Sequence, residues 1–494
     1  MKRVLVLAAF VATLAGCSLQ PKYQQPAAPV APAYPTGAAY KDVSGTTSPA
    51  TDIGWRDFLM DPRLQRLVEI ALKNNRDLRV AALNIASAQA QYRIQRAELF
   101  PAVDAAASST TTGTGLSGRT ITTHTYSADV SASWTIDFFG RVQSLSDQAL
   151  QQYFATAQAG KATYLLLVSQ VADQYLTVLA ADELLAVTRG TLEAAQKSYD
   201  LAVAQYRAGT GTLLSVRQAQ TVVEQAKAND AAQVRARAQA ENALVLLIGE
   251  PLPKDLPRGL PFNSQRFLAD IPAGLPSDLL TRRPDIMEAE ANLRAAYASI
   301  GAARAAFFPT ISLTGTFGKE SADLSNLFTP QAKAWSFVPS ISQPIFQGGS
   351  LKASLDATKI QKEISVAQYE KAIQTAFREV ADGLAGRGTY DDQIAAIERY
   401  VDAQQSSLEL SELRFRTGVD SYLNVLTAQT NLYNAQQLLV SSRLARLTNL
   451  VDLYQALGGG WIEHTRDAPR PAEDLALTQP VVRDVQKQGL FPVW

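Results

Sequence analysis

The chain has 494 residues, with 46 basic and 46 acidic side chains, so its formal net charge of zero does not indicate nucleic acid or another polyanion as a partner. It contains only two histidines, His124 and His464, and one cysteine, which nearly excludes a His/Cys metal centre and excludes an intrachain disulfide. The same scarcity argues against Ser/His/Asp or Cys/His catalysis. We expect neither an enzyme nor a cofactor.

The N-terminus has the pattern of an exported lipoprotein. Two basic residues precede a short apolar stretch that ends in Leu-Ala-Gly-Cys at Cys17, and this stretch is too short to span a bilayer. Residues 1–16 are therefore predicted to be a signal peptide, followed by either an incidental or a lipid-modified cysteine. The last four residues resemble the bacterial lipobox, which implies cleavage before Cys17 and a covalent N-terminal lipid on it. By the same resemblance, Ser18 implies delivery to the outer membrane.

The segment that follows changes from extended to helical. Residues 17–60 are rich in Pro, Ala, Ser and Thr and are predicted to be an extended tether. Asp61 before Pro62 is a typical helix start, with the aspartate as N-cap and the proline in the first helical position. We expect one helix to about Asn74 and a second over about 77–98.

Two pairs of segments alternate with the period of a β-strand. Residues 125–138 alternate strictly between apolar and polar side chains, as expected for a strand with one apolar face. Weaker alternation over 102–112 and a polar Gly/Ser/Thr-rich connection between the two predict a hairpin. The second half repeats this over 310–317 and 335–346, where two prolines weaken or bend the last strand.

A helical pattern without proline covers about 140–207, which corresponds to a helix about 100 Å long. Tyr164, Val168 and Val171 begin an apolar seam along it, at the spacing of a coiled coil. The chain then turns at a Gly-Thr-Gly sequence and returns as a helix over about 213–247. The first repeat, residues 61–249, is thus a helix, a β-hairpin, a long helix and a return helix.

The same order of elements returns in a second repeat, residues 277–460. Pro101, for example, returns as Pro309, 208 residues later. Such a long-period duplication predicts two equivalent structural units. The proline-rich segment 250–276 is predicted to be a linker or equatorial belt outside the core, and the polar C-terminal tail, 461–494, to wrap loosely around the fold.

The strands have consequences for assembly. We find no later run of about 18 consecutive apolar residues, so a membrane could be crossed only by a β-barrel. Four strands cannot close one; eight, from two chains, give an interior filled by side chains, and twelve, from three chains, leave a lumen. We therefore predict an α+β membrane protein: a homotrimer whose 12-stranded β-barrel, with four strands per chain, continues into a long α-helical coiled-coil barrel built from two tandem repeats.

The whole chain resembles the OprM-type outer-membrane efflux lipoproteins of the TolC-like family. Besides the lipobox and the duplicated unit, four runs carry the resemblance: Asp52-Ile-Gly-Trp-Arg56, Asn75-Arg-Asp-Leu-Arg79, Ile300-Gly-Ala-Ala-Arg-Ala-Ala-Phe-Phe-Pro309 and Leu457-Gly-Gly-Gly-Trp461. The resemblance implies a passive exit duct of a tripartite multidrug efflux system. Its implied partners are outer-membrane lipid, a periplasmic adaptor and an inner-membrane pump of the resistance-nodulation-division (RND) class, where drug selection is expected.

The two helix turns become the periplasmic tips in this scheme. They contain Gly209, Thr210 and Gly211 in the first repeat and Gly418 and Val419 in the second. Glycine turns can simply close helical hairpins. The family resemblance adds docking of the adaptor at these tips, and both roles are compatible.

Three residues near the second tip are gate candidates. Leu423 matches a position that forms a closing leucine ring in OprM-like channels, with ordinary coiled-coil packing as the alternative. Thr427 stands where those channels carry an aspartate ring. Asp420, nearer the tip, could supply such a ring instead, or it could be a solvated turn residue.

The aromatic residues of the predicted strands are expected to form the membrane girdle or the lipid-facing wall, rather than a ligand site, because they share the apolar face. They are Tyr126, Trp134, Phe138, Trp335 and Phe337. Two other functions compete with drug efflux. A lipid-tethered periplasmic scaffold would have no use for the alternating strands, and a duct for type I protein secretion is disfavoured by the lipobox.

Overall fold

The computed structural model describes residues 18–41, 49–116, 119–267, 274, 276–469 and 471–478. The predicted signal peptide and Cys17 lie outside the described residues. The chain forms two compact units: the first comprises Met1–Ala27, Asn84–Ala157 and Glu288–Lys371, and the second Ala28–Leu83, Gln158–Met287 and Ala372–Trp494. Each unit takes segments from both halves of the duplicated sequence, so the two halves are interleaved.

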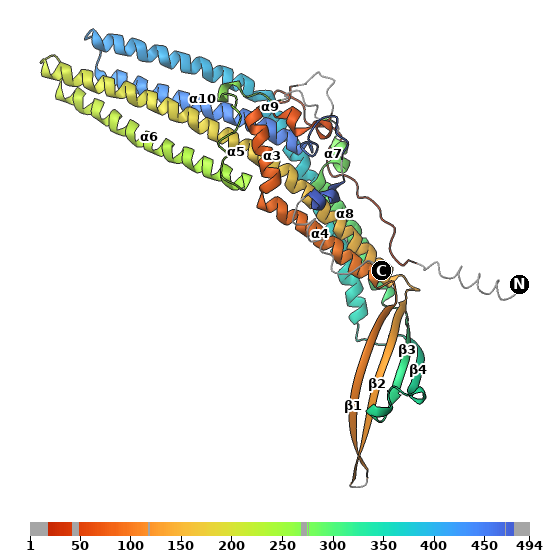
Figure 1. Ribbon diagram of the computed structural model, residues 1–494. Coiled ribbons are helices and arrows are strands. Elements are labelled where there is room, and N and C mark those ends of the chain that lie inside the picture. Colours follow the sequence, from red (N-terminus) through yellow and green to blue (C-terminus); the bar gives the residue numbers. More distant parts are fainter. Residues whose placement is uncertain are drawn as a thin grey trace. The chain divides into compact units, whose positions relative to one another are not determined.

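The first unit contains a four-stranded antiparallel sheet with the order β1-β2-β3-β4 (Figure 1). The strands are β1 (Ala102–Leu116), β2 (Arg119–Ile136), β3 (Thr310–Ser321) and β4 (Lys333–Ser342). Both predicted hairpins are present, and β2 pairs with β3 to join them. Within the described part of the chain, β1 and β4 are the outer strands of the sheet, so each has one edge without a strand partner.

The register gives the sheet one apolar and one polar face. Directly opposed residues of neighbouring strands project to the same face. One row across the sheet is Ala105, Val130, Phe317 and Trp335, and the adjacent row is Asp104, Ser131, Thr316 and Ser336. The predicted alternation is therefore confirmed.

Two strands end earlier than the alternation predicted. β2 ends at Ile136, and Phe138 lies in the following turn, where its backbone N–H donates to the carbonyl of Ile136 at 3.1 Å. The turn leads through Gly140, whose φ is 67°, into the next helix. β4 ends at Ser342, because Pro344 has no N–H to donate to a strand ladder. Phe138 is thus not a strand residue, and the expectation that it continues the apolar strand face was wrong.

Long helices account for most of the remaining chain. Two helices of 67 residues each, α5 (Arg141–Arg207) and α9 (Ser350–Arg416), are about 100 Å long. The others of more than four residues are α3 (Pro62–Asn74), α4 (Arg76–Ala97), α6 (Leu213–Ile248), α7 (Pro276–Arg282), α8 (Pro284–Ala305) and α10 (Tyr422–Ala456). Asp61 caps α3 with Pro62 in the first turn, as predicted.

One helix passes a simple length and hydropathy test for a membrane span. An 18-residue window of α5 has a mean hydropathy of 1.2, and 67% of that window is buried in the structure. Burial to this degree is typical of a core helix, and the predicted seam residues Tyr164, Val168 and Val171 are indeed buried.

The segments predicted to lie outside the core contribute to it. Phe262 and Phe267 of the proline-rich segment are buried, and the Phe267 ring stacks on Phe58 with centroids 5.4 Å apart. Trp461 is also buried, and the backbone N–H of Trp55 donates to the carbonyl of Ile462 at 3.0 Å. The start of the tail is therefore fastened to the segment before α3 rather than loosely wrapped.

The segment predicted to be an extended tether, residues 17–60, is only partly extended. Ala50–Asp52 form a 3-10 turn and Trp55–Phe58 a short helix, α2, with Trp55 and Phe58 buried. Residues 18–41 contain no helix, but they are docked rather than free. Within the first unit, the Tyr23 hydroxyl donates to the Glu290 carboxylate at 2.9 Å, and the Arg294 guanidinium lies 4.8 Å from the centre of the Tyr23 ring. Arg304 donates to the carbonyl of Leu19 at 3.2 Å. These contacts fasten the residues that directly follow Cys17 to α8.

Candidate gate and docking tips

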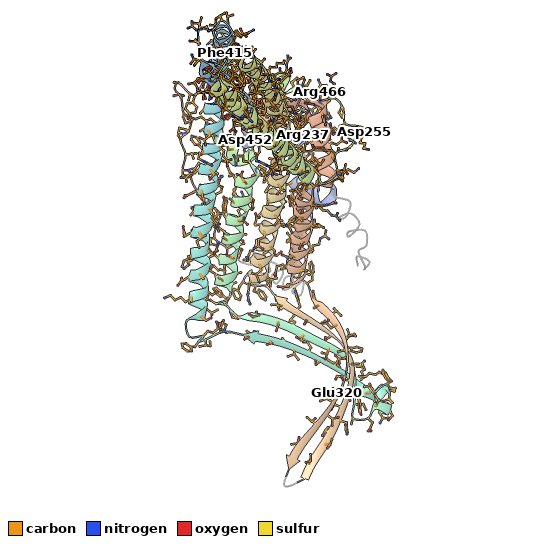
Figure 2. The ribbon with its side chains drawn as sticks, turned by 90° about the vertical axis from the view of Figure 1, so that its left-hand side faces the viewer. Arg237, Asp255, Glu320, Phe415, Asp452 and Arg466 are labelled. Carbon is orange, nitrogen blue, oxygen red and sulfur yellow. The ribbon has the colours of Figure 1, made fainter. Side chains whose placement is uncertain are left out.

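The two tips belong to one packed body. The ends of α5, α6, α9 and α10 run side by side in the second unit (Figure 1) and enclose a buried cluster. We call this group the tip cluster: Ala202, Val216, Ala219, Leu408, Tyr422, Val425, Ala428 and Leu432. Phe415, labelled in Figure 2, packs its ring 5.1 Å from that of Tyr422. The cluster takes residues from all four helices, so it couples the two tips.

The first tip is a tight glycine turn with a capped helix behind it. Gly209 has a φ of 76°, in the left-handed region that glycine adopts without a Cβ clash. The N–H groups of Thr210 and Gly211 both donate to the Gln205 carbonyl at 3.0 Å, which satisfies an orphan carbonyl at the end of α5. The Thr212 side chain then caps the N-terminus of α6.

The second tip has the same backbone path but a different cap. Gly418 has a φ of 77°, and the N–H of Val419 donates to the Arg414 carbonyl at 2.9 Å. Ser421 occupies the N-cap position of α10, yet its side chain makes no cap hydrogen bond. The start of α10 therefore lacks a stabilising contact that the start of α6 has.

An ion pair within the second tip changes the interpretation of Asp420. Arg414 Nε donates to Asp420 Oδ2 at 2.5 Å. This hydrogen bond holds the pKa of Asp420 below its usual range, because it favours the charged carboxylate. The carboxylate is ionised at neutral pH, but an arginine of the same chain offsets its charge. This pairing weakens the case for Asp420 as a free acidic ring.

Leu423 and Thr427 lie on a face of α10 that the tip cluster does not use. Leu423 is 54% exposed, whereas its neighbours Tyr422 and Val425 are buried. The Thr427 hydroxyl donates to the Leu423 carbonyl at 3.0 Å and is also exposed. This exposure argues against the alternative role for Leu423, which is coiled-coil packing within one chain. Leu214, at the equivalent place in α6, is 67% exposed as well.

The aromatic candidates of the sheet differ in environment. Trp335 is 71% exposed and Phe337 is also exposed, on the apolar face of β4. Trp134 is partly buried, and its indole N–H donates to the Leu99 carbonyl at 3.0 Å, which fastens the end of β2 to the segment after α4. Tyr126 is partly buried on β2. Each of the four thus lies in the sheet, and Phe138 lies in the turn after it.

Sequence reasoning missed the polar partners of these elements. Arg414 stands six residues before Asp420, and a basic residue near a helix C-terminus is a signal that could have suggested the pair. Asp61 and Arg283 also hold several hydrogen bonds in the second unit, from segments far apart in sequence. Nothing local identifies those partners.

Residues 67–250 and 275–459 match the family model described as outer membrane efflux protein. The chain belongs to the outer membrane efflux protein family. It is 48% identical over 476 residues to the probable efflux pump outer membrane protein TtgC of Pseudomonas putida, covering 95% of this chain and 98% of TtgC. It is 42% identical over 457 residues to the outer membrane protein OprJ of Pseudomonas aeruginosa, covering 91% and 94%.

A solved channel has the same fold. The open state of the Neisseria gonorrhoeae MtrE outer membrane channel matches with a TM-score of 0.82 and 39% identity, over 91% of this chain and all of that one. The protein is therefore an outer-membrane efflux channel with a TolC-like fold and a periplasmic helical extension. The predicted family, the predicted fold of one chain with four strands, long helices and two repeats, and the outer-membrane location are confirmed. The family is one of channels, so the protein is not an enzyme. Among the residues that the structure describes, no group of three or more His, Cys, Asp or Glu could hold a metal ion.

Proposed function

We propose that three copies of the chain form the outer-membrane exit duct of a tripartite efflux pump, together with a periplasmic adaptor and an inner-membrane RND pump. The observation that carries the proposal is the open four-stranded sheet with one apolar face. Its two free edges would expose unpaired backbone groups in lipid, and closing them with neighbouring copies removes that cost. Twelve strands are the smallest multiple of four that leaves a lumen.

Light scattering of the detergent-extracted protein tests this assembly. We expect three chains per particle, because trimer closure satisfies both sheet edges. A monomeric particle, or a dimer that resists dissociation, would contradict the proposal. A trimer that does not co-purify with a periplasmic adaptor would support the trimeric channel and contradict its assembly into a tripartite pump.

The cargo is proposed from the relatives. Similar proteins are named as components of antibiotic, toluene and solvent efflux pumps. We infer that this channel also passes apolar small molecules, and that their selection occurs in the pump. Deletion of the chain followed by a susceptibility panel of antibiotics and organic solvents tests the range. Unchanged susceptibility to all of them would contradict it.

The gate is placed at the second tip, where Leu423 side chains of three copies would meet near the axis. Leu423→Ala is expected to raise the single-channel conductance of the purified protein several-fold, because three smaller side chains widen and wet the constriction. Leu214→Ala is the matched control, since Leu214 occupies the equivalent position of the first repeat and is similarly exposed. Equal effects of the two substitutions, or none of either, would refute this assignment.

Adaptor docking is assigned to both tips, with Gly209, Thr210 and Gly211 in one and Gly418 and Val419 in the other. The exposed Val419 and Leu214 support this, because they offer apolar contacts beside each turn. Different caps on α6 and α10 support unequal roles, with the second tip as the part that moves.

Cys17 is assigned a covalent lipid. The docked path of residues 18–41 supports this, since contacts such as that of Tyr23 with Glu290 would hold the acylated end at α8. Labelled palmitate is expected in the wild-type protein and not in Cys17→Ser, as measured by autoradiography of the purified chain. Label that persists in the variant, or never appears, argues against lipidation at this residue.

A further inference from the structure

Two lysines face each other on the apolar side of the sheet. Lys319 of β3 is directly opposite Lys333 of β4, two residues along from the pair Phe317 and Trp335. Residues two positions apart in a strand project to the same face, so both lysines lie on the apolar face with Phe317 and Trp335. Like charges directly opposite each other destabilise a sheet. Within the described part of the chain, neither lysine forms an ion pair that would offset this repulsion.

The two ammonium groups keep free hydrogen-bond donors. Lys319 Nζ donates to the carbonyls of Phe328 and Thr329 at 2.6 and 3.3 Å, in the loop between β3 and β4, and an ammonium has three donors. Lys333 Nζ lies 5.3 Å from the centre of the Phe317 ring. Asp129 lines the same hollow but belongs to the adjacent row of the register, opposite Gly318, and pairs with neither lysine.

Apolar side chains surround the lysine pair. Phe317, Leu324, Phe328 and Trp335 are all exposed, and Ala105, Val130 and Phe317 line the hollow together with both lysines. A surface that combines two cations with exposed aromatic rings fits an amphipathic ligand better than a free ion. Such a ligand has an anionic head and apolar chains.

The height of the pair in the sheet indicates what that ligand is. From Thr310 to Lys319, β3 rises about 30 Å along the strand, which at a tilt of about 40° is roughly 23 Å along a barrel axis. The apolar band of an outer-membrane barrel is about 25 Å tall. Lys319 and Lys333 therefore lie one band height from the start of β3, near Glu320, which is labelled in Figure 2. The lipid headgroups of the outer leaflet lie at this level.

We propose that Lys319 and Lys333 together bind a phosphate group of a phosphorylated lipid headgroup in the outer leaflet. The inference rests on the proposed function, because it requires the sheet to be part of a membrane-inserted barrel. A phosphate offers charge-assisted acceptors to both ammonium groups and removes their mutual repulsion. The acyl chains of the lipid lie along Phe317 and Trp335 below the headgroup.

Native mass spectrometry of the full-length protein, incubated with lipid A and with dephosphorylated lipid A, tests the proposal. Lys333→Gln is the principal variant, because it leaves the loop contacts of Lys319 intact. We expect it to reduce bound lipid A roughly tenfold, in line with the loss of one charged hydrogen bond, and to leave the dephosphorylated lipid unaffected. Lys352→Gln, at an exposed lysine at the start of α9, should change neither.

Three results would overturn the inference. They are unchanged binding of lipid A by Lys333→Gln, equal binding of both lipids by the wild type, and full displacement of lipid A by excess inorganic phosphate. The last would identify a free-anion site. A separate measurement tests membrane insertion of the sheet. The fluorescence of Trp335, obtained as the wild-type signal minus that of Trp335→Phe, should be quenched by lipids with brominated acyl chains. Quenching with unchanged lipid A binding refutes only the lysine site, and absent quenching refutes membrane insertion of the sheet.

Discussion

Asp61→Ala is expected to destabilise the second unit by about 4 kcal/mol or more, among the largest effects of any single substitution in this chain. The Asp61 carboxylate is only 1% exposed. Its Oδ1 accepts the backbone N–H groups of Arg63 at 2.8 Å and Leu64 at 3.4 Å, and so caps α3. Alanine would leave both N–H groups unsatisfied at a buried helix N-terminus.

The second oxygen of Asp61 connects three segments. Oδ2 accepts the Tyr175 hydroxyl of α5 at 3.0 Å, the Leu260 N–H at 2.9 Å and Gln265 Nε2 at 2.7 Å. These donors come from the long helix and from the proline-rich segment, and Tyr175 and Gln265 are buried. The hydrogen bond to the carboxylate now offsets the cost of burying each donor. Without this acceptor, each donor is buried at an uncompensated cost in free energy.

Thermal unfolding followed by circular dichroism at the helix signal measures the effect. Asp61→Asn should show most of the destabilisation expected for Asp61→Ala. Its amide NH2 group is a donor, and it would face donors that the carboxylate oxygen now accepts from. Thr212→Ala, which removes a single exposed cap from α6, is the control and should cost about 0.5–1 kcal/mol. Asp61→Ala no more destabilising than that control would contradict the network role.

Arg283→Ala is expected to cost about 2–3 kcal/mol, because it removes a buried guanidinium that donates to a buried carbonyl and to two partly exposed carboxylates. The buried Arg283 donates Nη1 to the Ala456 carbonyl of α10 at 3.0 Å. It also donates Nε to Asp285 at 3.0 Å and Nη2 to Glu379 of α9 at 2.8 Å. One guanidinium therefore joins the end of α10 and the start of α8 to α9.

The duplication supplies a comparison for this site. Asn75 precedes Arg283 by the repeat offset of 208 residues and makes the equivalent junction, donating Nδ2 to the Leu247 carbonyl of α6 at 2.9 Å. Arg283→Asn should therefore be milder than Arg283→Ala in the same unfolding measurement. Arg378→Ala, at an exposed arginine beside Glu379, should have little effect. Equal losses from Arg283→Ala and Arg378→Ala would show that the junction contributes no stability.

Local sequence signals predicted the elements well. Strict alternation located the core of β2, although its last predicted residue, Phe138, lies in a turn. Proline and glycine marked the ends of α3, α5 and α9, because each acts through its own backbone restrictions. The tail and the proline-rich segment were mispredicted, because isolated aromatic residues such as Phe267 and Trp461 have no period to indicate burial.

For the candidate site too, the sequence predicted some residues, whereas other contacts became apparent only in the structure. The tips followed from glycine turns, and Leu423 followed from a family position. The pairing of Asp420 with Arg414 required the geometry of the turn, which brings together side chains six residues apart. The lysine pair on the apolar face depends on the register of β3 against β4, which a sequence pattern does not specify.

The sequence by itself determined the family, the duplication, the four strands and the long helices, because periodicity, turns and helix caps act over a few residues. Only the tertiary structure decided how buried polar groups are satisfied. Asp61 and Arg283 find their partners on segments that folding brings together from distant parts of the chain. A buried charge requires such partners, but its identity in the sequence does not say which segment supplies them.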